Sequence, residues 1–426
     1  MTMSNYKLVE STKMTPWDTP LYQVVATKTF TLANGVTINA GDVGGWIEKP
    51  SNLSGNAWVS DNAMVLGDAE VSGDAHISGN AVVRDDAKVS GKAQISDDAE
   101  VSDDACVGDD AEVSGDAQIY GNAKISGNAQ ISGNAEVFDK ACVGDHARVS
   151  GFAKVSDTVM VFGHAGVSGN TEISDNARIT GDALVSDFAR VSGNARVSGY
   201  AQVSDDALVT DNAEVTDNAT VSGEAHVYDQ AVVSGNAKIS DNAQVFDNAR
   251  ITDKACVCDE AMVSGNAKIS GKAKVSNDAR VFDNAEVFDT AEVSDDAHIS
   301  GDSKVFGDTR VFGHADVSGH AQISDQAEVF NSARISGNSQ ISGQAAAYGH
   351  AEVSGNAKLS GNANAYDNAQ IFDNAEVDEF ALISGNAKVH GNAKVSGNTE
   401  ISGNMDISGE EKLLSNYQVY GESEFW

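Results

Sequence analysis

The most distinctive candidates for chemistry are four aromatic residues that recur at intervals of 18 positions, at Phe312, Phe330, Tyr348 and Tyr366. Rings brought into line in this way could stack on a sugar or bind a peptide or a nucleotide. The alternative is a packing ladder that stiffens one corner of the fold. Ala347 and Ala365 stand beside the last two rings, and their small side chains predict either a notch or rings that fold inward. We therefore take the four aromatic residues as the candidate surface for a ligand or partner.

Histidines are the second candidates, because this side chain serves as a metal ligand or as a catalytic base. His314 and His350 are 36 positions apart, and His320 lies outside their series. His146 and His164 are 18 positions apart and could share an ion, but a zinc site needs further ligands. The alternative is a set of solvated histidines that replace Asn or Asp. The sequence therefore predicts no catalytic residue, no cofactor-binding residue and no specific metal ligand.

Adjacent aspartates could bind Ca²⁺ through stacked carboxylates. Such pairs occur at Asp97-Asp98, Asp103-Asp104 and Asp109-Asp110. No calcium-loop signature of fixed spacing repeats, and the alternative is a solvated acidic edge. Calcium at acidic corners is the one cofactor hypothesis that the sequence supports.

The chain has four cysteines, at Cys106, Cys142, Cys256 and Cys258. None has an evident catalytic partner, and a reactive thiol needs an environment that favours the thiolate. Nothing indicates a disulfide framework, so the cysteines favour a reducing, cytoplasmic origin.

The elements that must position these residues follow from a strict period of six. An aliphatic residue occupies every sixth position from Leu53 to Ile407 without insertion or deletion, except at Ala347 and Ala365. The unit fits a three-residue strand (Ala, variable, Val/Ile) and a three-residue corner (Ser, Gly/Asp, Asn/Asp). Because side chains alternate along a strand, Ala and Val/Ile face inward and the variable residue faces outward. Gly and Asn tolerate the left-handed backbone of a sharp corner, and their frequency excludes a helix.

The aromatic series gives the number of units in one coil. Aromatic residues at the corner recur at intervals of 18 residues, which is three units of six. Each coil therefore has three sides, and residues 18 positions apart stack on one another in successive coils. The repeats then make about 20 coils, and at about 4.8 Å between strands they predict a solenoid about 95 Å long. The predicted fold class is an all-β, single-stranded parallel β-helix.

Both ends depart from the repeat. Residues 1–52 hold all three prolines; Tyr22–Thr31 predicts a strand, Ala33-Asn34-Gly35 a turn, and Val36–Asn39 its partner strand. We interpret 1–52 as an N-terminal β cap, because an open strand edge recruits other chains. Residues 53–409 form the β-helix, and 410–426 form a second cap or a tail. A helical turn is expected at Glu410–Leu414.

The six-residue unit resembles that of left-handed parallel β-helix proteins. The left hand is implied by this resemblance alone, since parallel crossovers in general are right-handed. More narrowly, Gly44-Gly45-Trp46-Ile47 followed by Asn52–Val59 resembles the start of hexapeptide-repeat proteins of phages and prophages. In those proteins a short β cap with a Gly-Gly-Trp motif leads directly into the repeats. The resemblance covers essentially the whole chain and implies a phage or prophage origin.

Hexapeptide acyltransferases share this kind of repeat and use a histidine near a projecting loop. The similar carbonic anhydrases gather three histidines across neighbouring chains. The unbroken register from Leu53 to Ile407 leaves no such loop, and a shared fold does not imply a shared site. An acyltransferase is therefore an alternative hypothesis, and a homotrimer is an alternative to a monomer.

The formal net charge of −35 argues against a DNA or RNA partner, whose phosphates would be repelled. The first residues lack the apolar core of a secretory signal, and no apolar run reaches membrane-spanning length. We expect a cytoplasmic protein in the producing cell, or a component of a phage particle, with no membrane partner.

The outward residues include one comparatively basic series, with Lys88, Lys124, Lys268 and Lys304 among its members. Such a face could be where copies pack or where an anionic polymer lies, against the alternative of plain solvated surface. The leading hypothesis is a non-enzymatic structural rod or scaffold that presents a repetitive surface. Its partner is itself, as a homo-oligomer or end to end, or a protein or glycan. The alternatives are a binding module for a glycan, peptide or nucleotide, and the acyltransferase.

Overall fold

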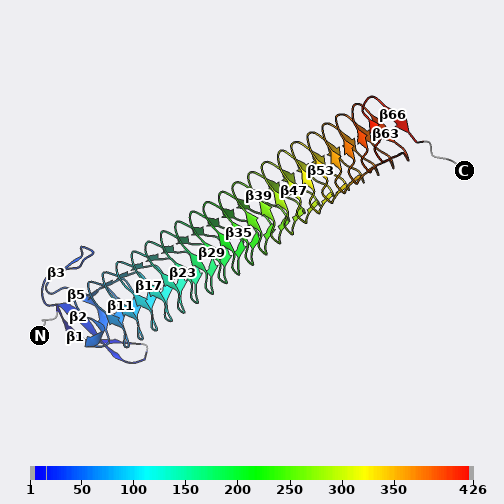
Figure 1. The fold of residues 1–426 in the computed structure, drawn as a ribbon. Coiled ribbons are helices and arrows are strands. Elements are labelled where there is room, and N and C mark those ends of the chain that lie inside the picture. The colour runs from blue at the N-terminus through cyan, green and yellow to red at the C-terminus, as the bar shows by residue number, and fades with distance from the viewer. Residues whose placement is uncertain (1–4, 16, 422–426) are drawn as a thin grey trace. The chain divides into compact units, whose positions relative to one another are not determined.

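The computed structural model describes residues 5–15 and 17–421, and it is all-β with stacked parallel coils and almost no helix (Figure 1). The expectation of a parallel β-helix is therefore confirmed. The chain divides into two compact units, residues 1–212 and 213–426. The left-handed sense of the coil stays a prediction.

In the first unit, strands of two residues follow one another every six positions, from β6 (Trp58–Val59) to β31 (Leu208–Val209). Each strand pairs in parallel with the third strand along the chain, as β6 does with β9 (His76–Ile77), where Trp58 lies opposite His76. The coil of 18 residues and three sides is therefore confirmed. The three sides are called face 1 (β6, β9 and every third strand), face 2 (β7, Met64–Val65, β10 and so on) and face 3 (β8, Glu70–Val71, β11 and so on).

The core is a column of alanine and aliphatic side chains. Ala153 and Val155, on either side of the outward Lys154, are both 0% exposed, and the same alternation holds throughout the coils. Full burial of a valine side chain is worth about 1.5–3 kcal/mol. Thr171 occupies an alanine position, where its buried hydroxyl has no hydrogen-bond partner.

Corners turn on residues with positive φ, as predicted for Gly, but the Asn that follows Gly does not adopt it. In many coils Asp takes the positive-φ position in place of Gly. Asp103 has φ 57°, and its Oδ2 accepts the backbone N–H of Gly121 in the next coil at 2.9 Å. The carboxylate thereby offsets the cost of a left-handed backbone. At Gly79 (φ 68°), an added Cβ would lie 2.7 Å from the backbone N of Asp97. Corner positions are thus held by contacts between successive coils.

The N-terminal segment (residues 5–52) is mainly antiparallel. β1 (Tyr6–Met14) pairs with β2 (Pro20–Ala26), and β2 pairs with β5 (Val43–Ile47). β5 also pairs in parallel with β7, which joins the segment to face 2 of the coils.

The predicted hairpin is present as β3 (Phe30–Thr31) and β4 (Thr37–Ile38). The single strand expected at Tyr22–Thr31 is wrong, because the chain leaves the strand after Ala26 and turns into the hairpin. β1 was not predicted. The Phe30 ring packs edge-on against Trp58 at 5.9 Å, so the hairpin covers the first coil on face 1.

The first residue of the coils to pair with the next coil is Leu53. After the short 3₁₀ helix η1 (Pro50–Asn52), Leu53 forms a parallel bridge with Val71. The buried Asn52 side chain donates hydrogen bonds to the carbonyls of Gly67 (3.1 Å) and Ala69 (2.8 Å).

The second unit repeats the same pattern from β32 (Glu214–Val215, face 3) to β62 (Lys394–Val395). The helical turn expected at Glu410–Leu414 is wrong: Lys412–Leu413 form strand β65, which pairs in parallel with β62. β64 (Asp406–Ile407) and β66 (Gln418–Tyr420) likewise pair with the preceding coil, β66 with β63 (Glu400–Ser402). The period of six prevails over the helical propensity of the local sequence. The domain boundaries and the role of 410–426 as cap or tail stay predictions, and 422–426 lie outside the described residues.

Candidate functional site

The four predicted aromatic residues form one continuous ladder in the second unit. Each follows the inward residue of a face 1 strand: β48 (Arg310–Val311), β51 (Glu328–Val329), β54 (Ala346–Ala347) and β57 (Asn364–Ala365). Successive ring centroids are 4.9, 4.8 and 5.2 Å apart, with planes within 6° of parallel. The structure therefore brings Phe312, Phe330, Tyr348 and Tyr366 together at the spacing of the coils, and all four are half-buried.

The geometry limits how this ladder can meet a ligand. Both faces of the Phe330 and Tyr348 rings are covered by the neighbouring rings, so a ligand would meet ring edges. Burial raises the pKa of Tyr348, and the nearby Tyr366 and Asp367 raise it further. The Tyr348 hydroxyl therefore remains protonated and can donate a hydrogen bond. Stacking on a sugar needs an open ring face, which the ladder leaves only at its first and last members.

Ala347 and Ala365 open no notch to the surface, because both are 0% exposed. Leu359, at β56 (Lys358–Leu359) on face 3, lies between them in sequence and is also fully buried. It is the one leucine among the aliphatic positions from Val59 to Ile407. A larger side chain beside two smaller ones preserves the volume of the core.

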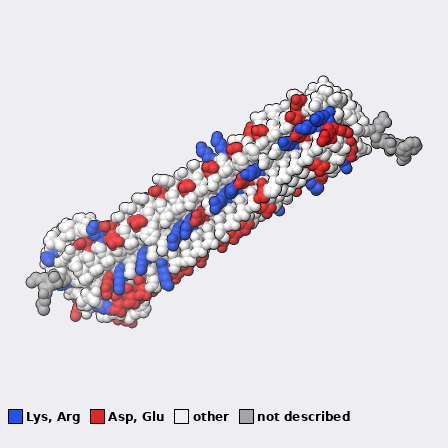
Figure 2. All heavy atoms as spheres, viewed as in Figure 1, with Lys and Arg blue, Asp and Glu red and all other residues white. Residues whose placement is uncertain are grey.

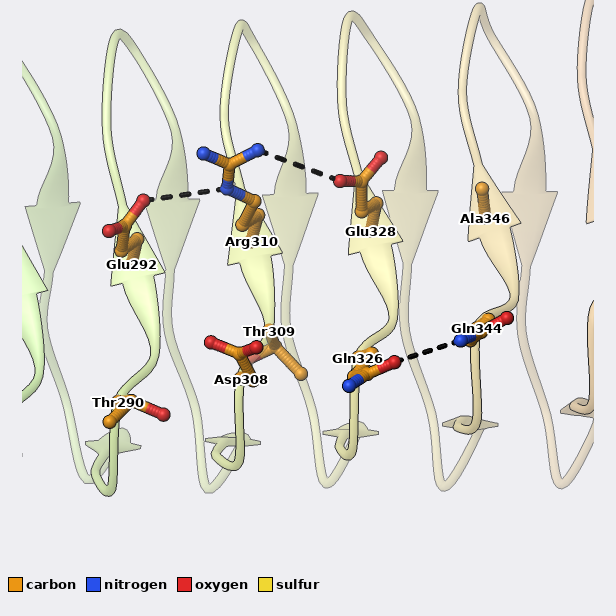
Figure 3. A pocket seen from close by; sticks show the side chains of 9 residues that line it. All are labelled: Thr290, Glu292, Asp308, Thr309, Arg310, Gln326, Glu328, Gln344 and Ala346. Atoms are coloured by element: carbon orange, nitrogen blue, oxygen red, sulfur yellow. Dashed lines mark hydrogen bonds and ion pairs between the residues drawn. The ribbon is translucent and has the colours of Figure 1, made fainter.

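A polar groove of about 580 Å³ lies on face 1, along strands β48, β51 and β54 (Figure 3). Its lining includes Arg310, whose guanidinium contacts Glu292 at 3.5 Å and Glu328 at 3.8 Å, so that the three side chains form a row across three coils. Along the groove's other side, Gln344 donates a hydrogen bond to Gln326 at 2.9 Å. Sequence reasoning missed this groove, although the small outward Ala346 that follows Glu328 in the row could have indicated a hollow.

Two pairs of the histidines considered from the sequence lie in contrasting environments. His314 and His320 each lie 3.3 Å from an aspartate of the preceding coil, Asp296 and Asp302. His146 and His164 instead stack on each other, with centroids 4.8 Å apart and planes 3° from parallel. Parallel rings direct their in-plane lone pairs side by side, so a metal ion between the rings would lie off both lone pairs.

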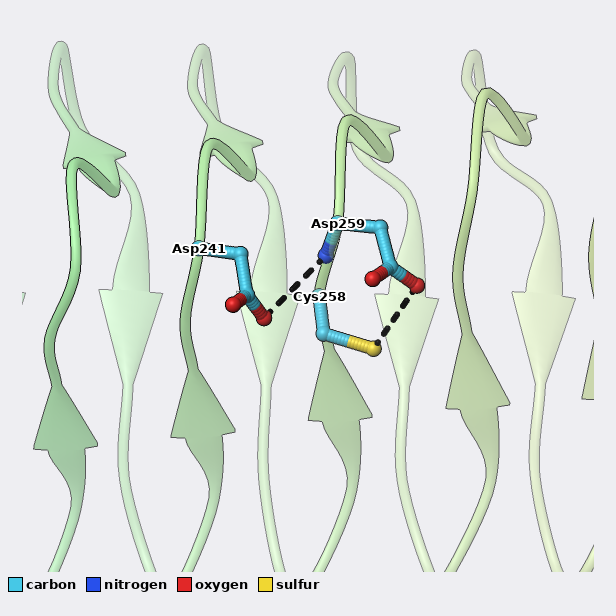
Figure 4. A group of neighbouring side chains, drawn as sticks. All are labelled: Asp241, Cys258 and Asp259. Atoms are coloured by element: carbon cyan, nitrogen blue, oxygen red, sulfur yellow. Dashed lines mark hydrogen bonds between the residues drawn. The ribbon is translucent and has the colours of Figure 1, made fainter.

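One group of described residues, Asp241, Cys258 and Asp259, places three potential metal-ligating atoms within 4.8 Å of one another (Figure 4). The Cys258 thiol donates to Asp259 at 3.5 Å, and the Asp259 N–H donates to Asp241 at 3.4 Å. Burial raises the pKa of the Cys258 thiol to about 12, and the nearby Cys256 and Asp259 add to this increase. Because zinc binds the thiolate, this pKa disfavours metal binding near neutral pH.

The adjacent aspartates divide their roles. Asp97, Asp103 and Asp109 have positive φ and accept the N–H of a glycine in the next coil at 2.9–3.1 Å. One oxygen of each is therefore already engaged. The second residue of a pair points elsewhere; Asp110, for example, contacts Lys92 at 3.1 Å.

Lys and Arg side chains form rows across the coils on the surface seen in Figure 2. On face 3 of the second unit, Glu286 is 3.0 Å from both Lys268 and Lys304, and hydrogen bonds from these two lysines lower the pKa of Glu286. On face 2 of the first unit, Lys154 contacts Glu136 at 3.3 Å. The basic series thus contains its own carboxylate partners, and each exposed pair is worth little individually.

A family model described as the YdcK beta solenoid repeat matches residues 117–133 and 189–201, which is a small part of the chain. The chain is thus similar to that family in repeats of the first unit. No curated protein compared with the chain matches it. In the part of the chain that the structure describes, no helix has the length and apolar character needed to cross a membrane.

Proposed function

We propose that this β-helix repeat protein is a non-enzymatic structural scaffold that presents a repetitive surface, encoded by a phage or prophage. The observation that carries the proposal is the register of the strands. From β6 to β31, and again from β32 to β62, every strand starts six residues after the previous one. No projecting loop interrupts either series, whereas enzyme pockets are usually built from such loops.

The side chains support the same role, because many of them bond the next coil. Asn ladders such as Asn338 to Asn356 and Asn356 to Asn374 (2.9 Å each) act with the aspartate corners and the stacked rings. Each coil is therefore tied to its neighbours at the backbone, the corners and the core. A repeat array built this way gains stability from nearest-neighbour contacts.

The N-terminal segment has the role of a cap in this proposal. Its strand β5 covers the edge of β7, and its hairpin β3–β4 packs against the first coil on face 1. The Gly-Gly-Trp motif and its resemblance support the phage or prophage origin. Cytoplasmic production, and assembly with copies of itself or with a protein or glycan, belong to the same proposal.

Light scattering combined with small-angle X-ray scattering tests the proposal. We expect a homogeneous particle whose length agrees with the about 95 Å expected from the strand spacing. The measurement is repeated with and without Ca²⁺, which separates a cation-dependent assembly from a constitutive one. Measured turnover with an acyl donor such as acetyl-coenzyme A would contradict the scaffold role, and a trimer would direct attention to histidines shared between chains.

A second candidate function is a ligand-binding module for a glycan, peptide or nucleotide on face 1 of the second unit. The observations that favour it are the groove of about 580 Å³ along strands β48, β51 and β54, and the ring face of Tyr366 at the end of the aromatic ladder. A glycan panel in a thermal-shift assay tests it, because a ligand that binds the folded chain raises its melting temperature. Tyr366→Ala should abolish such a shift, whereas Tyr228→Ala, in the separate stacked pair Tyr228–Phe246, should leave it intact.

A further inference from the structure

A pocket of about 380 Å³ in the first unit differs in its chemistry from the groove on face 1 of the second. Its lining consists of Asn128, Gln130, His146, Arg148 and His164. All five side chains carry N–H donors, and none is a carboxylate. In a chain with a net charge of −35, a hollow lined only by neutral and cationic donors is unexpected on composition alone.

Arg148 lies in a different environment from the equivalent arginine of the second unit. On face 1, Arg310 contacts a glutamate in the coil before it and another in the coil after it. Arg148, in β21 (Arg148–Val149), lies between Gln130 and Gly166 instead. Within residues 5–15 and 17–421, no carboxylate forms an ion pair with Arg148.

Gly166 follows Arg148 in the row of outward residues on face 1. It occupies an outward position, in β24 (Gly166–Val167), where the neighbouring coils carry Arg148 and Leu184. An added Cβ there would lie 2.9 Å from Cδ2 of Leu184. Gly166 therefore brings no charged group to the guanidinium, and the end of the Leu184 side chain lies over the position that a Cβ would take.

The two histidines show the same contrast with the second unit. His314 and His320 have an aspartate one coil earlier, whereas His146 follows Asn128 and His164 follows His146. When protonated, two rings stacked at 4.8 Å repel each other, and both repel a nearby guanidinium. An anion between these groups would remove the repulsion.

We propose that this pocket binds a tetrahedral oxyanion, namely sulfate, phosphate or the phosphate group of a monoester. The guanidinium of Arg148 supplies a planar fork that matches two oxygens of such a group. The two imidazoles and the amide of Asn128 supply further donors. Gln130 donates one N–H to Glu112 at 3.2 Å and keeps the other for the ligand. This assignment is independent of the scaffold function.

Binding should strengthen as the pH falls, because a protonated imidazole donates from both nitrogens and attracts an oxyanion more strongly than a neutral one. The carboxylates around the pocket are Asp110 and Asp182 in the same corner column, Asp145 beside His146, and Glu112. Two are engaged in ways that limit their repulsion of an anion: Asp110 contacts Lys92, and Asp145 accepts the N–H of Gly163 at 3.1 Å.

Isothermal titration of the full chain with sodium sulfate, in chloride buffer of constant ionic strength, tests the proposal. Sulfate keeps its charge across this pH range, so a change in affinity reports the protein. We expect saturable binding at about pH 5.5 that is at least about tenfold weaker at about pH 8. Arg148→Gln should weaken it at least about tenfold at the lower pH, in line with the loss of a charge-assisted hydrogen bond.

Arg190→Gln is the matched control, since Arg190 is an outward arginine of the same unit, on face 2, and is paired with Glu172 at 3.4 Å. It should leave sulfate binding unchanged. Gly166→Glu should weaken binding by giving Arg148 the partner that Arg310 already has. Asn replaces His readily at these corners, as Asn128 shows, so His146→Asn with His164→Asn should fold and lose the pH dependence.

Absence of saturable sulfate binding at the lower pH would overturn the proposal. Equal affinity in the wild type and Arg148→Gln would also overturn it. Comparison of inorganic phosphate with glucose 6-phosphate then separates the two sources of the oxyanion. Tighter binding of the monoester supports a ligand whose organic part fills the rest of the pocket, and equal binding supports a free anion.

Discussion

The N-terminal segment and the coils are stabilised in opposite ways. In the coils one contact is repeated many times: an inward alanine and an inward valine or isoleucine, and a corner residue that bonds the next coil. In the segment each contact occurs once, as when the Lys13 ammonium lies 4.8 Å from the Trp46 ring centre, or when the Ser11 hydroxyl donates to the Leu21 carbonyl at 2.8 Å. The cost of a substitution in the coils therefore depends on its position in the unit of six, whereas in the segment it depends on the individual residue.

The junction between them combines both kinds of contact. β5 is antiparallel to β2 and parallel to β7, and its Trp46 N–H donates to the Ala63 carbonyl at 2.9 Å. Gly44 and Gly45 lie so close to the first coil that their backbone leaves no room for a side chain. An added Cβ at Gly44 would lie 2.3 Å from the Val59 carbonyl oxygen.

The largest effect is expected for Gly45→Ala, which tests whether the two regions form one cooperative structure. Its Cβ would lie 2.6 Å from the Ala63 carbonyl oxygen and 2.7 Å from a Val59 methyl, so the segment must shift away from the coil. We expect a loss of about 3 kcal/mol in the local stability of β5 and β7, at the upper range for overpacking. Hydrogen exchange of the amides in these two strands measures it.

Gly166→Ala is the control for this substitution, since its added methyl would meet only the flexible end of Leu184. It should change stability by less than about 0.5 kcal/mol, as for most surface substitutions. Fast exchange confined to β1, β2 and β5 in Gly45→Ala would show that the segment detaches while the coils persist. Unchanged exchange in all these strands would contradict the close packing at the junction.

A smaller loss of stability is expected for Val155→Ala in the coils, because Val155 is one of many equivalent side chains that make up the core. Val155 is fully buried between coils, and loss of its two methyl groups should cost about 2 kcal/mol, including the cavity. A chemical denaturation midpoint measures the change, with Lys154→Ala at the outward neighbour as the control. If Val→Ala at other inward positions lowers the free energy of unfolding by the same amount, the coils are equivalent, as the repeat predicts. Large differences between coils would contradict this equivalence.

The sequence was sufficient to predict the coils because the signal is local and repeated. The aliphatic period, the small inward alanines and the 18-residue series of corner residues all indicate the same register, which the strand pairs follow. The period even extends to Leu413 and Val419, beyond Ile407 where the expectation stopped, because Glu410–Leu414 also suits a helix. β1 could not be predicted, since its alternation is weak and its partner β2 is specified only by tertiary pairing.

A further difference concerns the corners, where the coils place acidic residues at positive φ. Asp103→Ala removes the acceptor of the Gly121 N–H and leaves a methyl-bearing residue at φ 57°, so we expect a loss of about 1–2 kcal/mol. Asp103→Gly should recover part of this stability, because glycine adopts positive φ freely. Thermal unfolding measures both variants, with Asp104→Ala as the control. Equal effects at Asp103 and Asp104 would show that net charge, rather than the corner bond, is responsible.

The candidate sites were less predictable than the fold. The aromatic ladder follows from spacing alone, because stacked coils place residues 18 positions apart side by side. The pocket at His146 and Arg148 is notable because neither residue that flanks Arg148 on the face, Gln130 or Gly166, carries a carboxylate. The outward residues do not follow the repeat. The structure is therefore needed to show which charged side chains lack an oppositely charged neighbour in the adjacent coils.

The smallest effect is a pH dependence that should be confined to the contact between the segment and the coils. The His76 side chain lies beneath the hairpin β3–β4, with Nε2 2.9 Å from the Ser60 hydroxyl and Nδ1 3.5 Å from the Asn34 amide. Burial lowers the pKa of His76, and this outweighs the opposite influence of Asp61. The unfolded chain therefore binds the proton more readily, and stability falls as the pH drops below the ordinary histidine value of about 6.5. Exchange of the hairpin amides should accelerate, beyond the intrinsic pH effect, between about pH 7.5 and pH 5, and His76→Gln should remove this acceleration. An equal acceleration in coils far from His76 would instead show that the coils and the segment respond to protonation as one structure.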